Sequence, residues 1–194
     1  MTTNAVKTDR RYSRIVGYRH SSAEILDAAI EVSVENGLSS LTFARVAEAL
    51  GISDRMVVYY FPTKVDLVVG VAERLGSELQ DLLARAFGDE RRSPEELLSF
   101  AWPVLATRRG DRVFALFFEM IGFASSGQEP YPAMVRALME GWRDWLAERV
   151  EGDRIDLRRR GALSVMARID GLLLMRRTMG NDAAQLAARE LGIT

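Results

Sequence analysis

Apolar residues recur every three or four positions along most of the chain after residue 20, and this spacing predicts amphipathic helices. The alternating pattern typical of β-strands is absent from the sequence. The expected helices cover residues 21–36, 42–50, 54–61, 63–87, a segment opened by Ser93, and then 112–124, 132–150, 161–175 and 182–191. We therefore expect an all-α fold, with a small three-helix unit followed by a larger helical body.

Residues 42–64 contain the most specific pattern of the sequence, two short helices joined by the turn Gly51-Ile52-Ser53. Thr42 can cap the first of these helices, and Ser53 is placed to cap the second. Gly51 lies where the first helix must end and the chain must turn, a position that tolerates positive φ. A helix-turn-helix of this kind presents its second helix to the major groove of DNA.

The second helix of this motif is expected to have a buried side and an exposed side. Val57, Tyr60 and Phe61 should enter the core of the three-helix unit. The outward-facing residues, which can meet base edges or phosphates, are Asp54, Arg55, Met56 and Tyr59.

From about Arg19 to Val69 the chain resembles the DNA-binding domain of the TetR family of bacterial transcriptional regulators. The matching positions are Thr42, Val46-Ala47, Gly51-Ile52-Ser53, Tyr60-Phe61, Lys64 and Leu67. The resemblance implies that Thr42, Tyr59 and Lys64 hold phosphates, while the start of the recognition helix faces bases. The full set of predicted DNA-binding residues is Thr42, Arg45, Ser53, Asp54, Arg55, Met56, Tyr59 and Lys64.

Two positions depart from the family pattern. Val58 stands where the family usually has a phosphate-binding tyrosine, which should weaken nonspecific DNA binding modestly. Arg55 and Met56 replace a small residue and a hydroxyl, which suggests an unusual operator, with Arg55 a candidate for guanine O6 and N7 or for a phosphate. The alternative is a helical small-molecule-binding or protein-interaction module whose DNA function has been lost or repurposed.

The charge of the chain is balanced overall and uneven locally. The sequence has 26 Lys plus Arg and 27 Asp plus Glu, a formal net charge of −1, so it is no polycation. The first 20 residues nevertheless contain Lys7, Arg10, Arg11, Arg14 and Arg19 against Asp9 alone. We expect this arm to lack fixed structure when free. It either follows the DNA backbone or the minor groove, or it is a solubilising tail.

Length and composition limit the remaining possibilities. After the three-helix unit, roughly 125 residues remain, about one further domain. We expect a basic arm over 1–20, a DNA-binding domain over 21–68 and a helical ligand-binding and dimerisation domain over 69–194. With no cysteine, a single histidine (His20) and no phosphate-binding glycine loop, the sequence argues against catalysis and predicts no metal and no cofactor. Without a membrane-length apolar run or a signal-peptide core, we expect a cytoplasmic protein.

The second domain is rich in aromatic residues and methionine. Such residues are core residues first, but they also line apolar ligand cavities because they are large and adaptable and leave irregular gaps. Members of the TetR family commonly bind small molecules there, so the resemblance implies a hydrophobic or aromatic effector. The candidate ligand-binding residues are Trp102, Phe114, Phe117, Phe118, Phe123, Met134, Trp142, Met166 and Asp170.

Two carboxylates in this domain differ in their expected surroundings. The helical neighbours of Asp170 are apolar, so its face should be buried, and a buried carboxylate needs a partner. That partner is either an ion pair or helix contact in the core or dimer, or a ligand. Glu119 shares its face with Arg112, Ala115 and Gly122 and is expected on a thin solvent-facing stripe.

The last two helices predict a partner subunit. Residues 161–175 are apolar around most of the helix, and residues 182–191 place Ala184, Ala187, Ala188 and Leu191 on one face, so both need a second covering surface. A symmetric homodimer follows, and the resemblance implies a four-helix interface. Two recognition helices would then meet half-sites of a palindromic operator roughly 34–36 Å apart. The resulting hypothesis is a repressor that a ligand releases through the long helix 63–87.

Overall fold

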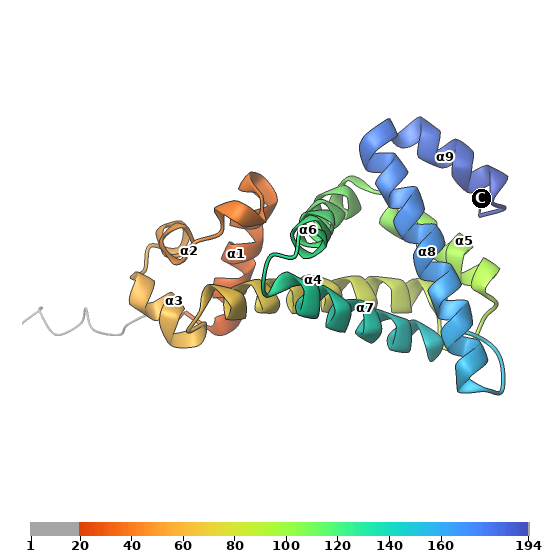
Figure 1. The fold of residues 1–194 in the computed structure, drawn as a ribbon, viewed down its shortest axis with the longest axis horizontal. Coiled ribbons are helices and arrows are strands. Elements are labelled where there is room, and N and C mark those ends of the chain that lie inside the picture. Colours follow the sequence, from red (N-terminus) through yellow and green to blue (C-terminus); the bar gives the residue numbers. More distant parts are fainter. Residues whose placement is uncertain (1–19, 194) are drawn as a thin grey trace, which may run out of the picture.

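The computed structural model describes residues 20–193, which fold into helices without any strand, as the sequence predicts. In chain order the elements are α1 (Ser22–Asn36), the short 3-10 helix η2 (Leu38–Ser40), α2 (Phe43–Leu50), α3 (Asp54–Tyr60), α4 (Lys64–Phe87), α5 (Pro94–Leu105), α6 (Arg108–Ser125), α7 (Tyr131–Ala147), α8 (Ile155–Met179) and α9 (Asn181–Glu190). Figure 1 shows α1–α3 at one end of the molecule and α5, α8 and α9 at the other, with α4 running between them. Across residues 20–193, no helix has the combination of length and hydropathy that crossing a bilayer requires.

Side-chain caps fix most of the expected helix starts. Ser21, Thr63 and Ser93 each form a capping box at the start of α1, α4 and α5. The Thr42 hydroxyl accepts a hydrogen bond from the Arg45 N–H at 3.3 Å and so caps α2. Ser53 occupies the cap position of α3, but its side chain makes no capping hydrogen bond, so that part of the prediction is wrong.

Two helices are longer than the apolar periodicity suggested. α6 begins at Arg108 instead of residue 112, because the Thr107 hydroxyl accepts from the Gly110 N–H at 3.1 Å and caps an arginine-rich first turn. α8 covers Ile155–Met179 instead of 161–175, since its two ends are polar helical turns. The hydrophobic pattern locates the packed part of a helix and misses turns that extend into solvent.

A first buried core packs the helices of the helix-turn-helix unit against one another. Val46, Ala47 and Val57 are fully buried in it, and Gly51 ends α2 in the left-handed conformation at φ 65°. Tyr60 and Phe61 are partly buried against the same core, as predicted. The other buried residues of this core are Ile25, Ala29, Leu38, Leu41, Leu67, Val68, Val71, Ala72, Leu116, Met120 and Tyr131. The core thus extends beyond α1–α4 to α6 and the start of α7.

A second buried core lies between α4, α5, α6, α7, α8 and α9. Trp102 and Phe87 are its largest fully buried side chains. Ala184 and Ala188 of α9 are also fully buried here, packed within their own chain. This alanine face was expected to need a second covering surface, and α8 of the same subunit supplies it.

Polar contacts fasten α6 to the N-terminal helices. The Glu119 carboxylate accepts hydrogen bonds from the backbone N–H groups of Leu38 (2.7 Å) and Ser39 (2.9 Å), and so caps η2 from a distant helix. Glu119 was expected to face solvent, and this expectation is wrong. The side of α6 that carries it faces η2 instead of solvent. Gly37 permits the contact, since a Cβ there would lie 3.3 Å from a carboxylate oxygen.

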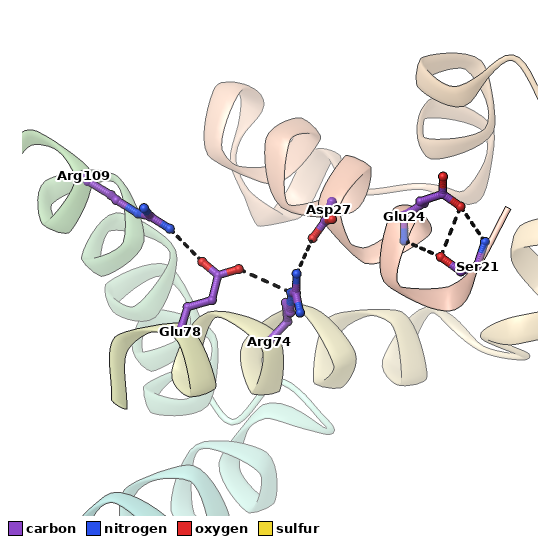
Figure 2. A network of polar contacts seen from close by, with 6 residues as sticks. All are labelled: Ser21, Glu24, Asp27, Arg74, Glu78 and Arg109. Carbon is purple, nitrogen blue, oxygen red and sulfur yellow. Dashed lines mark hydrogen bonds and ion pairs between the residues drawn. The ribbon is translucent and has the colours of Figure 1, made fainter. Parts of the chain in front are cut away.

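A chain of ion pairs makes a second fastening between α1, α4 and α6, drawn in Figure 2. Arg74 on α4 contacts Asp27 on α1 at 3.2 Å and Glu78 at 3.3 Å. Glu78 in turn contacts Arg109 of α6 at 2.8 Å. These pairs are largely exposed, so each contributes little to stability, about 0–1 kcal/mol.

We predict that Glu119→Ala destabilises the protein by about 1–3 kcal/mol, because two backbone donors lose a charged acceptor. Glu31→Ala is the matched control, since Glu31 pairs with Arg112 of α6 only through exposed side chains at 3.3 Å. Chemical denaturation followed by circular dichroism measures both. Equal, small effects of the two substitutions would contradict a special role for the Glu119 contact.

Candidate DNA-binding surface and ligand cavity

The exposed side of α3 carries most of the predicted DNA-binding residues. Ser53, Asp54 and Arg55 are exposed, and Tyr59 is the most exposed large hydrophobic side chain of the motif, at 78%. Met56 was expected to point outward as well, but it is partly buried, so it offers less surface than its neighbours. Val57 is fully buried on the opposite side and fixes α3 to the core.

Three more predicted residues come from the elements beside α3. Thr42, Arg45 and Lys64 are all exposed, at the start of α2 and at the start of α4. Arg45 and Lys64 both reach toward η2, with their side-chain nitrogens 3.5 Å from the Ser40 and Ser39 carbonyl oxygens. The predicted DNA-binding residues therefore lie on α2, α3 and the first turn of α4 or directly before these helices. Figure 1 shows these elements at the same end of the molecule. Their contact with DNA stays a prediction.

The aromatic pair in α3 has a defined geometry. The Tyr59 and Tyr60 rings meet edge to face, with centroids 5.1 Å apart. Tyr60 is partly buried, so it supports the Tyr59 ring while leaving the Tyr59 hydroxyl in solvent. Val58 is also exposed, at the position where the family pattern has tyrosine. The basic residues of the N-terminal arm, from Lys7 to Arg19, lie outside the described residues.

A cavity of about 100 Å³ lies where the two cores meet, between α4, α5, α6, α7 and α8. Of the predicted ligand-binding residues, those that line it are Phe114, Phe117, Trp142, Met166 and Asp170. Their side chains come from α6, α7 and α8, which the sequence pattern alone does not bring together. Binding of a ligand by these residues stays a prediction.

Four of the predicted ligand-binding residues do not line the cavity. Trp102 is buried, and its indole N–H donates to the Gln185 side chain at 3.2 Å. Phe118 packs against the rings of neighbouring phenylalanines on α6. Phe123 and Met134 belong to the first core, where Phe123 stacks on Tyr131 at 4.8 Å. Composition identified them as large apolar residues, but it does not reveal which core they fill.

The wall formed by α4 was missed by the sequence analysis. The lining residues from this helix are Ala72, Leu75, Gly76, Leu79, Leu83 and Phe87. They recur every three to four residues, so the pattern was visible as an apolar face. A periodic face indicates burial, and only the packing of the other helices shows that a void is left against it.

Asp170 is the only charged residue that lines this cavity within the described part of the chain. Burial raises the pKa of its carboxyl from 3.8 to about 6. Among residues 20–193, no hydrogen bond or ion pair involves the Asp170 side chain. Of the alternatives from the sequence, a partner in the core of the same subunit is not found among residues 20–193, whereas a contact across a dimer and a ligand both stay predictions.

These features define a class of protein: a helix-turn-helix unit with an exposed recognition helix, joined by a long helix to a larger helical body that contains an apolar cavity. Residues 25–71 match the profile described as "Bacterial regulatory proteins, tetR family". The match covers the helix-turn-helix unit, which thus resembles the DNA-binding domain of a family of transcriptional regulators.

Individual proteins agree with this assignment. The HTH-type transcriptional regulator RutR of Escherichia coli (strain K12) is 33% identical over 75 residues, which are 39% of this chain and 34% of RutR. The chain thus aligns with about a third of the length of the curated relatives that it matches.

Solved structures share the fold over most of the chain. A TetR-family regulator from Rhodococcus sp. superposes with a TM-score of 0.69 at 16% identity, covering 88% of this chain and 97% of that one. A regulator from Saccharomonospora viridis, solved in complex with choline, superposes with a TM-score of 0.67 at 18% identity, covering 88% and 92%.

Asp170 generates a prediction about stability and pH. Its pKa is higher in the folded than in the unfolded chain, so its ionisation disfavours folding. The penalty is absent below about pH 4, grows between 3.8 and about 6, and is complete above that range. The difference between a pKa of 3.8 and one of about 6 corresponds to at most about 3 kcal/mol in the free energy of unfolding.

Asp170→Asn is therefore expected to raise the free energy of unfolding by about 1–3 kcal/mol at pH 7.5 and to have little effect near pH 4. Denaturant titrations at the two pH values measure this difference. Asp153→Asn, at an exposed loop position, serves as the control. A gain that does not depend on pH would contradict the assignment to ionisation of Asp170.

Proposed function

We propose that this protein is a dimeric, sequence-specific DNA-binding repressor that a small apolar ligand releases from its operator. The observation that carries the proposal is the position of α4. Its first turns belong to the core that holds α3, and its later turns form a wall of the cavity. The match of residues 25–71 to the TetR-family model supports action in the cytoplasm on DNA.

The exposed side of α3 supports reading of the major groove. Arg55 stands in the first turn of the helix, exposed, where a guanidinium can bind guanine O6 and N7 with two hydrogen bonds. Tyr59 and Lys64 offer a hydroxyl and an ammonium group to phosphates, and such contacts fix the position of the helix on the duplex.

Arg55→Ala combined with Tyr59→Ala is expected to lower the affinity for the DNA upstream of the protein's own gene by at least tenfold, since each contact contributes about 1–3 kcal/mol. Fluorescence anisotropy at two salt concentrations measures the loss. Arg85→Ala is the control, because this exposed arginine lies at the far end of α4. Unchanged binding by the double variant would favour the alternative of a protein-interaction or small-molecule-binding module.

An apolar stripe on α8 supports the homodimer. Leu163, Ala167, Gly171 and Leu174 recur at spacings of four, four and three residues, and all are exposed. A Cβ added at Gly171 would meet no atom within 4 Å, so another backbone can approach closely there. Leu186 on α9 is exposed too. A twofold axis beside α8 would cover this stripe with its own copy.

Leu174→Glu is expected to convert the dimer to a monomer, because two carboxylates would be buried opposite each other across the twofold axis. Sedimentation velocity measures the mass in solution, and operator affinity should fall with it. Phe100→Glu introduces the same charge at an exposed aromatic on α5 and should leave the dimer intact. A dimeric Leu174→Glu variant would place the interface elsewhere.

Ligand release is supported by the apolar lining of the cavity and by a solved structure of the same fold. A protein of the same fold was solved in complex with choline. A ligand that fills the cavity displaces the α4 wall, tilts this helix and changes the spacing between the two recognition helices. Because α6 lines the same cavity and also holds η2 through Glu119, it moves with α4.

The coupling between ligand and operator is expected to be about 1–3 kcal/mol and to be equal in both directions. Titrating ligand in the presence and in the absence of saturating operator measures one direction, and titrating operator with and without ligand measures the other. Equal ligand affinity with and without operator would end the proposal of release while leaving DNA binding intact.

A further inference from the structure

Among the described residues, Asp170 has no hydrogen-bond or ion-pair partner, although its own helix is rich in arginine. Arg159 pairs with Asp144 at 2.9 Å, Arg168 with Glu95 at 3.1 Å and Arg176 with Asp111 at 2.6 Å. These three arginines of α8 therefore already contact other carboxylates. An ionised carboxylate that faces an apolar cavity is unfavourable unless a positive charge lies beside it.

The walls around Asp170 suit an organic cation better than an anion or a hydrated ion. Trp142, Phe114 and Phe117 present aromatic rings to the same cavity, and ring faces attract cations. The other lining residues are apolar and give a metal ion no further oxygen or nitrogen side-chain ligands. An anion would meet only repulsion from Asp170. The cavity volume of about 100 Å³ fits a small ligand with a single six-membered ring.

We propose that the effector of this protein is a small organic monocation, an ammonium or amidinium group on an apolar single-ring body, with Asp170 as its counterion. This inference rests on the proposed function, because it names the ligand class of the same cavity. The positive charge of the ligand balances the negative charge of Asp170. The apolar part of the ligand fills the cavity and packs against the residues of α4 that line it. The raised pKa of Asp170 in the free protein fits a site that lacks this charge.

A pair of isosteric probes tests the charge alone. Phenyltrimethylammonium and tert-butylbenzene have nearly the same shape and differ in one positive charge. Quenching of tryptophan fluorescence, from Trp142 and the neighbouring Trp145, reports binding of either probe to the full-length protein. We expect the cation to bind about tenfold or more tightly than the neutral isostere, since ion pairing and ring contacts both favour it.

Asp170→Asn separates the charge of the site from its shape. This variant should lose the preference for the cation and bind tert-butylbenzene at least as well as the wild type, which also shows that its cavity is folded. Asp153→Asn, an exposed loop carboxylate, should keep the full preference. A cation that also weakens operator binding by the wild type, and not by Asp170→Asn, would support its role as effector class.

The outcomes distinguish this inference from the function on which it rests. Equal binding of the two probes by the wild type, or an unchanged preference in Asp170→Asn, overturns the assignment of a cationic ligand and leaves an apolar ligand cavity standing. Binding of neither probe to the wild type overturns both the cationic ligand and the cavity as a binding site. DNA binding by α3 is independent of each result.

Discussion

The shared burial of α4 in two cores is the constraint on which the rest of the structure depends. Leu67, Val68 and Val71 anchor its first half among the helices that hold α3, while Leu83 and Phe87 anchor its second half among α5, α7 and α8. A continuous helix transmits a displacement along its length, because its backbone hydrogen bonds resist bending. Through α4, α3 is therefore connected to the helices that line the cavity.

Glu119 adds a second constraint of a different kind. It holds η2 through two backbone donors and lies between Leu116 and Met120, which both line the cavity. The Glu119 carboxylate lies at the edge of the first core, and burial, and then this nearby carboxylate, raise the pKa of the Tyr131 hydroxyl. With α4 on one side and α6 on the other, the N-terminal unit is held at two places, and both of these helices also line the cavity.

Local chemistry made the N-terminal motif predictable, and non-local packing hid the rest. Thr42, Gly51 and Val57 act on residues within one or two turns of themselves, so their roles follow from spacing. Glu119 contacts residues about 80 positions away, and nothing in its own neighbourhood indicates this. Likewise, Phe114 and Phe118 look alike in sequence, yet one lines the cavity and the other packs on its neighbours. Which apolar face is left unfilled depends on all the helices together.

Asp170 shows why an unfavourable residue can be informative about function. A leucine at this position would fill part of the cavity and remove an unpaired charge, so stability alone favours replacement. Proteins keep such groups where binding uses them, because the free energy of placing a charge in an apolar site is recovered when a complementary ligand arrives. The same cost explains selectivity: a neutral molecule of the right shape fills the volume but leaves the carboxylate unpaired. Asp170 and α4 line the same cavity, so in the proposed function a ligand that pairs with this carboxylate also contacts the helix that leads to the DNA-binding unit.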